Sequence, residues 1–321
     1  MKVCREHFIP DLPSPAARAL FKSSVEIVPI SISRHCNRIC DYCPNSFVDR
    51  LSVHDLMDDG LFASVICQLG EIYYDGTVCI NRYNEPLADM EYALRRVRQI
   101  RAAMPAAKIE ISSNGDFLDR DGVWALYQAG VTDLIVTCHQ QPKVHDFSNL
   151  IRLLEIRLGK LGLPMFDLMR WPNAAQASIA VGPNMKFMYR AFDADYLTPD
   201  GELTTINDRG GIYPTPYRRS APCFRPFRAF EVEWDGSLWP CCQIHNDVPQ
   251  HMEYCLGHLT PESDIFAVWV SETYVAWRKE MFSYDAKRAP CASCNFMVGD
   301  VLGDSAKDRG GLADMRERWG L

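Results

Sequence analysis

Short β-branched runs alternate with amphipathic stretches in the first part of the chain, between Val25 and Val136. This alternation is typical of a parallel sheet that is covered by helices. The expected strands are residues 25–33, 77–81, 108–113 and 133–138.

The stretch between the second and third runs, residues 89–100, has the pattern of an amphipathic helix. Its apolar side chains recur at helical spacing at Met90, Leu94, Val97 and Ile100. We expect this face to pack on the sheet. The arginines expected to point largely outward are Arg95, Arg96, Arg98 and Arg101.

The pattern changes twice further along the chain. Residues 150–222 mix strand and helix signals, and we place the remaining strands of the sheet there. Residues 229–242 read as a strand, an Asp-Gly turn and a second strand, which predicts a β-hairpin. The expected organisation is an extension over residues 1–24, an α/β domain over 25–215 and a smaller domain over 216–321.

Composition and charge place the chain among ordinary globular proteins. Hydrophobic residues make up 47% and charged residues 23%, with a net charge of −7, which argues against disorder and against a basic nucleic-acid binder. The longest uncharged run, residues 171–185, is too short to cross a bilayer. The N-terminus lacks the apolar core of a signal peptide. We expect a cytoplasmic protein with no membrane or nucleic-acid partner.

Thirteen cysteines are unusual for such a chain, because disulfides are rare in reducing compartments. Cys36, Cys40 and Cys43 form a C-x3-C-x2-C motif directly after the first strand. Three thiolates on one loop can hold an iron–sulfur cluster and leave one iron open to a small molecule. The alternatives are a zinc loop, with His35 as a further ligand, and three incidental thiols.

This motif, with Tyr42 before the third cysteine and a strand before the loop, closely resembles the signature of the radical S-adenosylmethionine (radical SAM) superfamily. The resemblance implies a partial (β/α)6 barrel and a 4Fe-4S cluster whose open iron chelates SAM. It also implies reductive cleavage of SAM to methionine and a 5'-deoxyadenosyl radical, which abstracts a hydrogen atom from the substrate.

The resemblance further implies SAM contacts after the second and third strands. The family carries Gly-Gly-Glu or a variant after the second strand, where this chain has Tyr83-Asn84-Glu85-Pro86 and retains only the glutamate. The sequence SSNGD after the third strand matches the usual ribose and carboxylate contacts, although it also reads as a plain turn. The expected SAM contacts are Tyr42, Asn84, Glu85, Pro86, Ser112, Ser113 and Asn114.

Polar residues that could face the cavity are the candidates for removing a substrate proton. His139 and Gln140 follow the fourth strand, at the end of the barrel where active sites collect. Each candidate also has a structural interpretation as a hydrogen-bonded or SAM-facing residue. The catalytic candidates are His139, Arg170 and Arg209, and Tyr83 and Asp116 are further polar residues of this kind.

A second set of cysteines lies near the C-terminus, where Cys223, Gly236 and Cys241 precede the C-x2-C pair Cys291 and Cys294. Four thiolates make a closed site, either a cluster or a structural zinc ribbon. The order of residues resembles the twitch domain, a shortened relative of the SPASM domain, and this implies one fully ligated auxiliary 4Fe-4S cluster. Cys242 and Cys255 are unassigned, although the glycine spacing favours Cys241 over Cys242.

An auxiliary cluster can accept the electron that a substrate radical loses. The architecture resembles that of radical SAM aminocyclitol dehydrogenases, which implies oxidation of a small sugar, aminocyclitol or nucleoside-like metabolite and a flavodoxin- or ferredoxin-type electron donor. The alternatives are a peptide maturase, sulfur insertion and a non-enzymatic zinc module. Three cysteines in apolar patterns are expected to be buried hydrophobes, namely Cys67, Cys79 and Cys138.

Overall fold

The computed structural model describes residues 3–139, 146–193, 208–213, 215–296 and 305–321, and the chain divides into two compact units. The sheet unit contains Pro29–Ile206 and Glu233–Asp235. The hairpin unit contains Met1–Val28, Asn207–Val232 and Gly236–Leu321. The first 28 residues therefore group with the C-terminal part of the chain, whereas the sequence pattern predicted a separate extension ending at residue 24.

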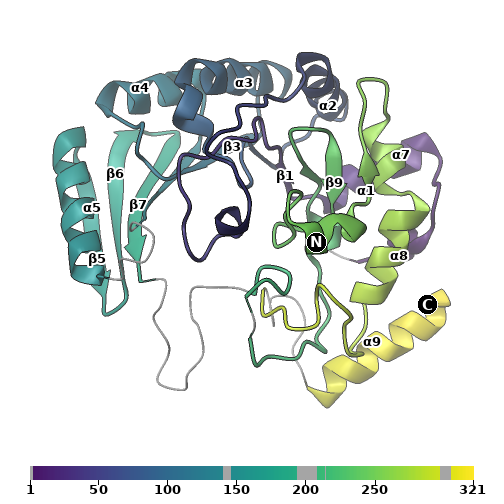
Figure 1. Cartoon of the computed structure of the whole chain (residues 1–321). Coiled ribbons are helices and arrows are strands. Elements are labelled where there is room, and N and C mark those ends of the chain that lie inside the picture. The colour runs from purple at the N-terminus through teal and green to yellow at the C-terminus, as the bar shows by residue number, and fades with distance from the viewer. Residues whose placement is uncertain (1–2, 140–145, 194–207, 214, 297–304) are drawn as a thin grey trace. The chain divides into compact units, whose positions relative to one another are not determined.

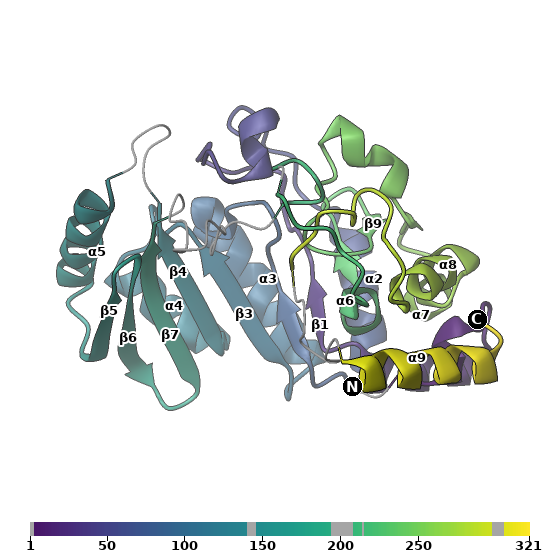
Figure 2. The ribbon, with the colours of Figure 1, turned by 90° about the horizontal axis from the view of Figure 1, so that it is seen from below.

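The sheet has seven strands in the order β1-β2-β3-β4-β7-β6-β5 (Figures 1 and 2). The pairs β2–β3, β3–β4 and β4–β7 are parallel, as expected for an α/β domain. All four strands predicted before residue 139 are present, and the others lie within residues 150–222 as expected. The strands are β1 Ile27–Pro29, β2 Thr77–Cys79, β3 Lys108–Ser113, β4 Asp133–Cys138, β5 Met165–Trp171, β6 Ala174–Gly182 and β7 Met185–Phe192.

The last three strands depart from the strand–helix repeat. β5 pairs with β6, and β6 with β7, in antiparallel fashion. The connections, residues 172–173 and 183–184, are only two residues long. A parallel connection needs about a dozen residues, so these short turns force hairpins.

Four helices accompany the sheet, and an aspartate caps the N-terminus of each. Their bounds are α2 Asp59–Glu71, α3 Met90–Ala103, α4 Arg120–Ala129 and α5 Phe147–Leu161. The carboxylates of Asp58, Asp89, Asp119 and Asp146 accept hydrogen bonds from main-chain amides of the first turns. In Figure 1, α2, α3 and α4 lie side by side along one face of the sheet.

Helix α3 carries one correction to the predicted pattern. The arginines were expected to point outward, but Arg96 is fully buried. Its guanidinium donates to the Met57 carbonyl at 3.1 Å and to the Tyr92 hydroxyl at 2.8 Å, and it pairs with Asp59. Asp59 balances the buried charge, and Asp59 and Met57 both come from a distant segment that helical periodicity does not reveal.

The hairpin unit contains the predicted hairpin. Strands β8 (Glu231–Val232) and β9 (Ser237–Trp239) are antiparallel, and β10 (Gly257–His258) adds a third strand that the pattern did not predict. The helices of this unit are η1 Arg5–Phe8, α1 Ser14–Ser24, α6 Arg225–Arg228, η4 Pro249–Tyr254, α7 Ile265–Trp269, α8 Glu272–Met281 and α9 Ala306–Trp319. The sheet unit has two short 3-10 helices, η2 Pro44–Phe47 and η3 Pro86–Asp89.

Aromatic packing explains why the N-terminal residues belong to the hairpin unit. The Phe21 ring on α1 lies 5.2 Å from the Phe266 ring and 5.3 Å from the Trp269 ring on α7. Phe8 packs on Phe282 at 5.1 Å.

Among the described residues, no helix has the length and apolar character needed to cross a membrane.

Candidate active site

The three cysteines of the first motif lie close together on the loop after β1. The Cys43 amide donates to the Cys40 carbonyl at 2.9 Å, which makes a tight turn between the second and third cysteines. Burial and the neighbouring Cys43 thiolate raise the pKa of Cys36 to about 11, and burial with Cys43 and Cys36 raises that of Cys40 to about 12. Thiols this close repel one another as thiolates, and a bound metal cluster would relieve that repulsion.

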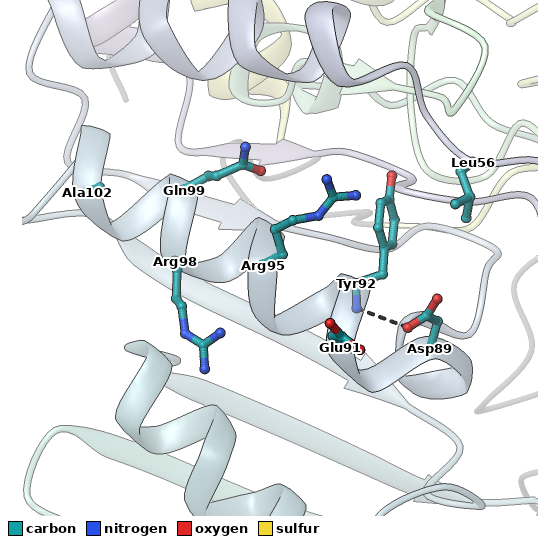
Figure 3. A pocket seen from close by; sticks show the side chains of 8 residues that line it. All are labelled: Leu56, Asp89, Glu91, Tyr92, Arg95, Arg98, Gln99 and Ala102. Carbon is teal, nitrogen blue, oxygen red and sulfur yellow. Dashed lines mark hydrogen bonds between the residues drawn. The ribbon is translucent and has the colours of Figure 1, made fainter.

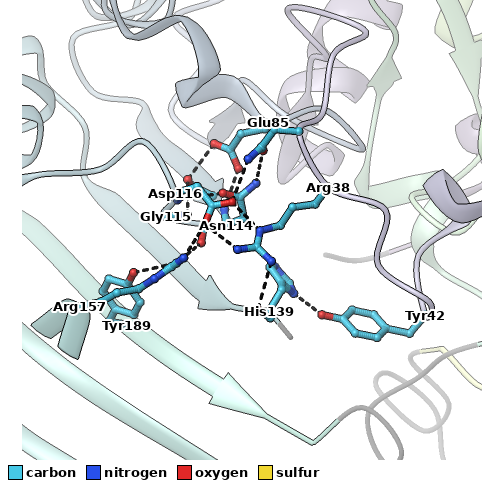
Figure 4. A network of polar contacts seen from close by, with 11 residues as sticks. Arg38, Tyr42, Glu85, Asn114, Gly115, Asp116, His139, Arg157 and Tyr189 are labelled. Atoms are coloured by element: carbon cyan, nitrogen blue, oxygen red, sulfur yellow. Dashed lines mark hydrogen bonds and ion pairs between the residues drawn. The ribbon is translucent and has the colours of Figure 1, made fainter. Parts of the chain in front are cut away.

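Two side chains between the first two cysteines attach this loop to the end of β3 (Figure 4). Arg38 donates from Nε and Nη2 to the two carboxylate oxygens of Asp116, each at 2.6 Å. Asn37 donates to Asp116 at 2.8 Å and accepts from Asn114 at 2.7 Å. The loop is therefore fixed to the turn that the sequence SSNGD forms.

Asp116 also receives a hydrogen bond from Arg157 on α5, so one carboxylate joins three segments. Burial raises the pKa of Asp116. The hydrogen bonds from Arg38 and Arg157 and the charge of Arg38 outweigh burial and lower that pKa to about 2. The turn needs Gly115, which has φ of +74°; a Cβ there would lie 2.5 Å from Val136 Cγ1. Arg38 was open to detection because it lies inside the cysteine motif, whereas no local signal marks Arg157.

Glu85, Ser113 and Asn114 come together by direct hydrogen bonds, as their predicted common role requires. The Glu85 carboxylate accepts from Ser113 Oγ at 2.8 Å and from the Asn114 amide at 2.7 Å. Burial raises the pKa of Glu85. A buried carboxylate with amide and hydroxyl donors still has room to accept a hydrogen bond from a ligand cation.

Tyr42 and His139 also meet, from the cysteine loop and the end of β4. The Tyr42 hydroxyl is hydrogen-bonded to His139 Nδ1, and the Tyr42 ring lies 5.8 Å from that of Phe192. Burial, reinforced by the charge of Arg38, lowers the pKa of His139 to about 3. The imidazole is therefore neutral near pH 7 and orients the tyrosine.

The other predicted residues have different surroundings. The Asn84 side chain bonds to Ser33 Oγ and to main-chain groups of its own turn, while the Ser112 amide bonds to Asn81 Oδ1. Pro86 begins η3, and Tyr83 is buried. Gln140 lies outside the described residues.

One catalytic candidate, Arg170, does not join this group. Arg170 was expected to face the cavity, but it is exposed on the edge strand β5 and pairs with Glu155 of α5. An ion pair at the surface satisfies the guanidinium there, which is why strand position alone was misleading. Arg209 belongs to the hairpin unit.

The predicted burial of three cysteines needs one correction. Cys67 is exposed on α2, whereas Cys79 and Cys138 are buried as expected.

Two hollows open on the sheet unit. One of 380 Å³ is lined in part by His35, His54, Glu85, Pro86 and Phe117, next to the cysteine loop. A larger one of 790 Å³ lies on the outer face of α3 (Figure 3). None of the predicted site residues lines this larger hollow, so we assign the chemistry to the region of the cysteine loop.

The four cysteines of the second motif gather within the hairpin unit. Burial, and then the charges of Cys242, Cys291, Cys294 and Cys223, raise the pKa of Cys241. Burial and the charges of Cys223 and Cys294 likewise raise the pKa of Cys291. Thiols that influence one another in this way fit the ligand set of a single cluster.

The motif leaves Cys242 and Cys255 unassigned, and each makes contacts of its own. Cys255 Sγ donates to the Gly257 carbonyl at 3.3 Å, beside β10. Cys242 Sγ accepts from Gln243 Nε2 at 3.6 Å, whereas Cys241 Sγ accepts from the Gln243 amide at 3.4 Å. Across the described part of the chain, no three His, Cys, Asp or Glu side chains converge to hold one metal ion.

Comparisons with known proteins give a family match for the C-terminal part of the chain and a relative for most of its length. Residues 223–295 match the SPASM family, described as an iron–sulfur cluster-binding domain. The chain is 24% identical over 273 residues to the S-adenosyl-L-methionine-dependent 2-deoxy-scyllo-inosamine dehydrogenase of Niallia circulans. That match covers 84% of this chain and 92% of the relative. The chain is therefore similar to an S-adenosyl-L-methionine-dependent dehydrogenase, and its C-terminal part matches an iron–sulfur cluster-binding domain.

Two solved structures have a similar fold. The crystal structure of BtrN in complex with AdoMet and 2-DOIA has a TM-score of 0.55 and 23% identity, over 80% of this chain and 87% of BtrN. An open conformation of BtrN gives a TM-score of 0.51 and 20% identity, over 80% and 85%. The predicted α/β fold is confirmed, and residues 223–295 match an iron–sulfur cluster-binding domain, as predicted for the C-terminal part of the chain.

Proposed function

We propose that this enzyme oxidises a secondary alcohol of a small aminocyclitol or related sugar-like metabolite to a ketone. The proposal rests on the proximity of Cys223, Cys241, Cys291 and Cys294, whose charges act on one another, because an oxidation needs a place for the second electron. The relative from Niallia circulans supports this substrate class, since its name specifies the dehydrogenation of an aminocyclitol.

When bound, the cluster at Cys36, Cys40 and Cys43 supplies the electron that cleaves SAM, and the auxiliary cluster takes up the electron released by the substrate. Glu85 offers a buried carboxylate to the amino group of SAM. Ser113 and Asn114 hold that carboxylate in position. Tyr42, oriented by His139, places an aromatic ring beside the same site.

The oxidation balances as the loss of one hydrogen atom, one proton and one electron from the alcohol. The hydrogen atom leaves the carbinol carbon and completes 5'-deoxyadenosine. The hydroxyl proton goes to a base and finally to solvent, and the electron leaves as the C=O bond forms. The proton acceptor is not His139, because a pKa of about 3 makes its imidazole a weak base.

We further propose a flavodoxin- or ferredoxin-type protein as the electron donor and the cytoplasm as the location. Each cleavage of SAM consumes one low-potential electron, and a donor must supply it in every turnover that does not return the electron to the cluster. Low-potential iron–sulfur and flavin carriers are the donors suited to that demand.

A substrate panel tests the proposal. The anaerobically reconstituted enzyme is incubated with dithionite, SAM and, in separate reactions, aminocyclitols, sugars, nucleosides and short peptides. We expect 5'-deoxyadenosine and a product two mass units lighter with an aminocyclitol or sugar. A mass change confined to the peptides would replace the proposal with peptide maturation, and a sulfur-containing product would replace it with sulfur insertion.

A further inference from the structure

The guanidinium of Arg219 is buried beside the segment that leads into Cys223. Only 2% of the residue is exposed. Nε donates to the Ala221 carbonyl at 3.1 Å, and Nη2 donates to the Pro222 carbonyl at 2.8 Å. These bonds fix the main chain immediately before the first auxiliary cysteine.

The same guanidinium reaches the segment of the last auxiliary cysteine. Nη1 donates to the Phe296 carbonyl at 2.7 Å and to the Cys294 carbonyl at 3.2 Å. Nη1 also lies 3.9 Å from Cys294 Sγ. One side chain therefore links two segments that are 75 residues apart.

Arg219 has no carboxylate partner among the described residues. Its hydrogen-bond acceptors are main-chain carbonyls and the sulfur of Cys294. Arg225, in the same unit, instead pairs with the buried Glu231 at 2.6 Å. A buried cation without a counter-charge is costly, so the placement of Arg219 calls for a negative group.

The group that fits is the cluster held by Cys223, Cys241, Cys291 and Cys294. Four thiolates around a 4Fe-4S core give a net negative charge, and reduction adds one more. Charge and hydrogen bonds at the sulfurs set the potentials of such clusters. A fixed cation near Cys294 stabilises the reduced form more than the oxidised form.

We propose that Arg219 is the counter-cation of the auxiliary cluster and raises its reduction potential, which favours uptake of the substrate electron. This positioning role rests on the proposed function. It gives a buried residue outside the cysteine motif a part in the oxidation, through the cluster and without contact with the substrate.

The test measures the potential of the auxiliary cluster directly. The full chain carrying Cys36→Ala, Cys40→Ala and Cys43→Ala retains only the auxiliary ligands, so an EPR-monitored redox titration reports one cluster. Adding Arg219→Gln should lower the equilibrium constant of reduction about tenfold, equal to about 59 mV for one electron. Arg278→Gln is the matched control, because Arg278 is also fully buried with three carbonyl acceptors, from Pro226, His7 and Trp269.

An unchanged midpoint in Arg219→Gln, or an equal shift in Arg278→Gln, would overturn the proposal. If Arg219→Gln loses its iron, Arg219→Lys decides. The charge of Arg219 is supported as the cause if the lysine variant keeps about four irons per chain and has a midpoint potential close to that of the chain with Arg219 intact. Loss of iron from the lysine variant, or a lowered midpoint potential, refutes that role. If the chain with Arg219 intact binds no 4Fe-4S cluster at the auxiliary site, the proposed function fails, which is a separate result.

Discussion

Arg38 and Asp116 form a bidentate ion pair that joins the cysteine loop to the end of β3. Arg38 lies between two of the predicted cluster ligands, and Asp116 follows Asn114, a predicted SAM contact, by two positions. The pair therefore couples the position of the cluster loop to the position of the SAM contacts. Planar two-point pairing of this kind fixes orientation as well as distance.

Replacing Asp116 by asparagine should destabilise the full chain. Both Arg38 and Arg157 lose their carboxylate partner. We expect the free energy of unfolding to fall by roughly 2 kcal/mol, which is less than the cost of breaking a fully buried ion pair because these pairs are partly exposed. Anaerobic urea unfolding measures this loss. Asp75→Asn, at an exposed site, is the control and should change stability by less than about 0.5 kcal/mol.

The Asp116 effect should depend on pH with a defined sign. Its pKa is lowered to about 2 in the folded chain, below the usual value of about 3.9. The stabilisation is therefore complete above about pH 4 and is lost as the pH falls toward 2. The difference between the two chains should stay constant from pH 5 to 8 and shrink below pH 4; a difference that grows on acidification would contradict the pairing.

Cys36→Ala should abolish formation of 5'-deoxyadenosine. The loop then keeps only two of three ligands, and the iron content should fall from about eight to about four per chain. Cys67→Ala removes an exposed thiol on α2 and should leave both readouts unchanged. Full SAM cleavage by Cys36→Ala would exclude the loop as the cluster site.

Cys291→Ala should separate SAM cleavage from substrate oxidation. The auxiliary site loses one of its four ligands, so the substrate radical has no acceptor, while the loop cysteines remain intact. We expect 5'-deoxyadenosine to form with little ketone, as measured by mass spectrometry of the same reaction. Cys255→Ala serves as the control, because Cys255 bonds to the Gly257 carbonyl instead. Undiminished ketone from Cys291→Ala would remove the auxiliary cluster from the reaction.

His139→Gln should impair SAM binding without moving the pH profile. Burial lowers the pKa of His139 to about 3, so its charge does not change between pH 6 and 9. Loss of its bond to Tyr42 should raise the KM for SAM several-fold. Loss of an ionisation near pH 6 to 7 from the kcat profile of the variant would instead identify His139 as the base.

Local patterns predicted most of the fold because they depend on neighbouring residues. The strands before residue 139 and the hairpin around Gly236 follow from alternation and turn residues. The burial of Arg96 was missed because its partner Asp59 comes from another helix. The antiparallel end of the sheet was missed because two-residue connections carry no strong signal in a mixed stretch.

The sequence points to the cysteines of the candidate site more readily than to the arginines that hold its segments in place. Cysteine spacing predicts the loop and the C-terminal set as ligands, and residues 223–295 match the SPASM family model. Arg157 and Arg219 act through contacts between residues far apart in sequence, which no single-sequence pattern encodes. Arg170 failed as a candidate because a surface ion pair on β5 satisfies it.

Transfer of deuterium tests the central claim most directly. An aminocyclitol substrate identified by the panel, carrying deuterium at the carbinol carbon, is incubated anaerobically with the enzyme, dithionite and SAM. The account predicts one deuterium in 5'-deoxyadenosine and an equal amount of deuterium-free ketone at that carbon. Ketone formed while 5'-deoxyadenosine stays unlabelled would contradict the account.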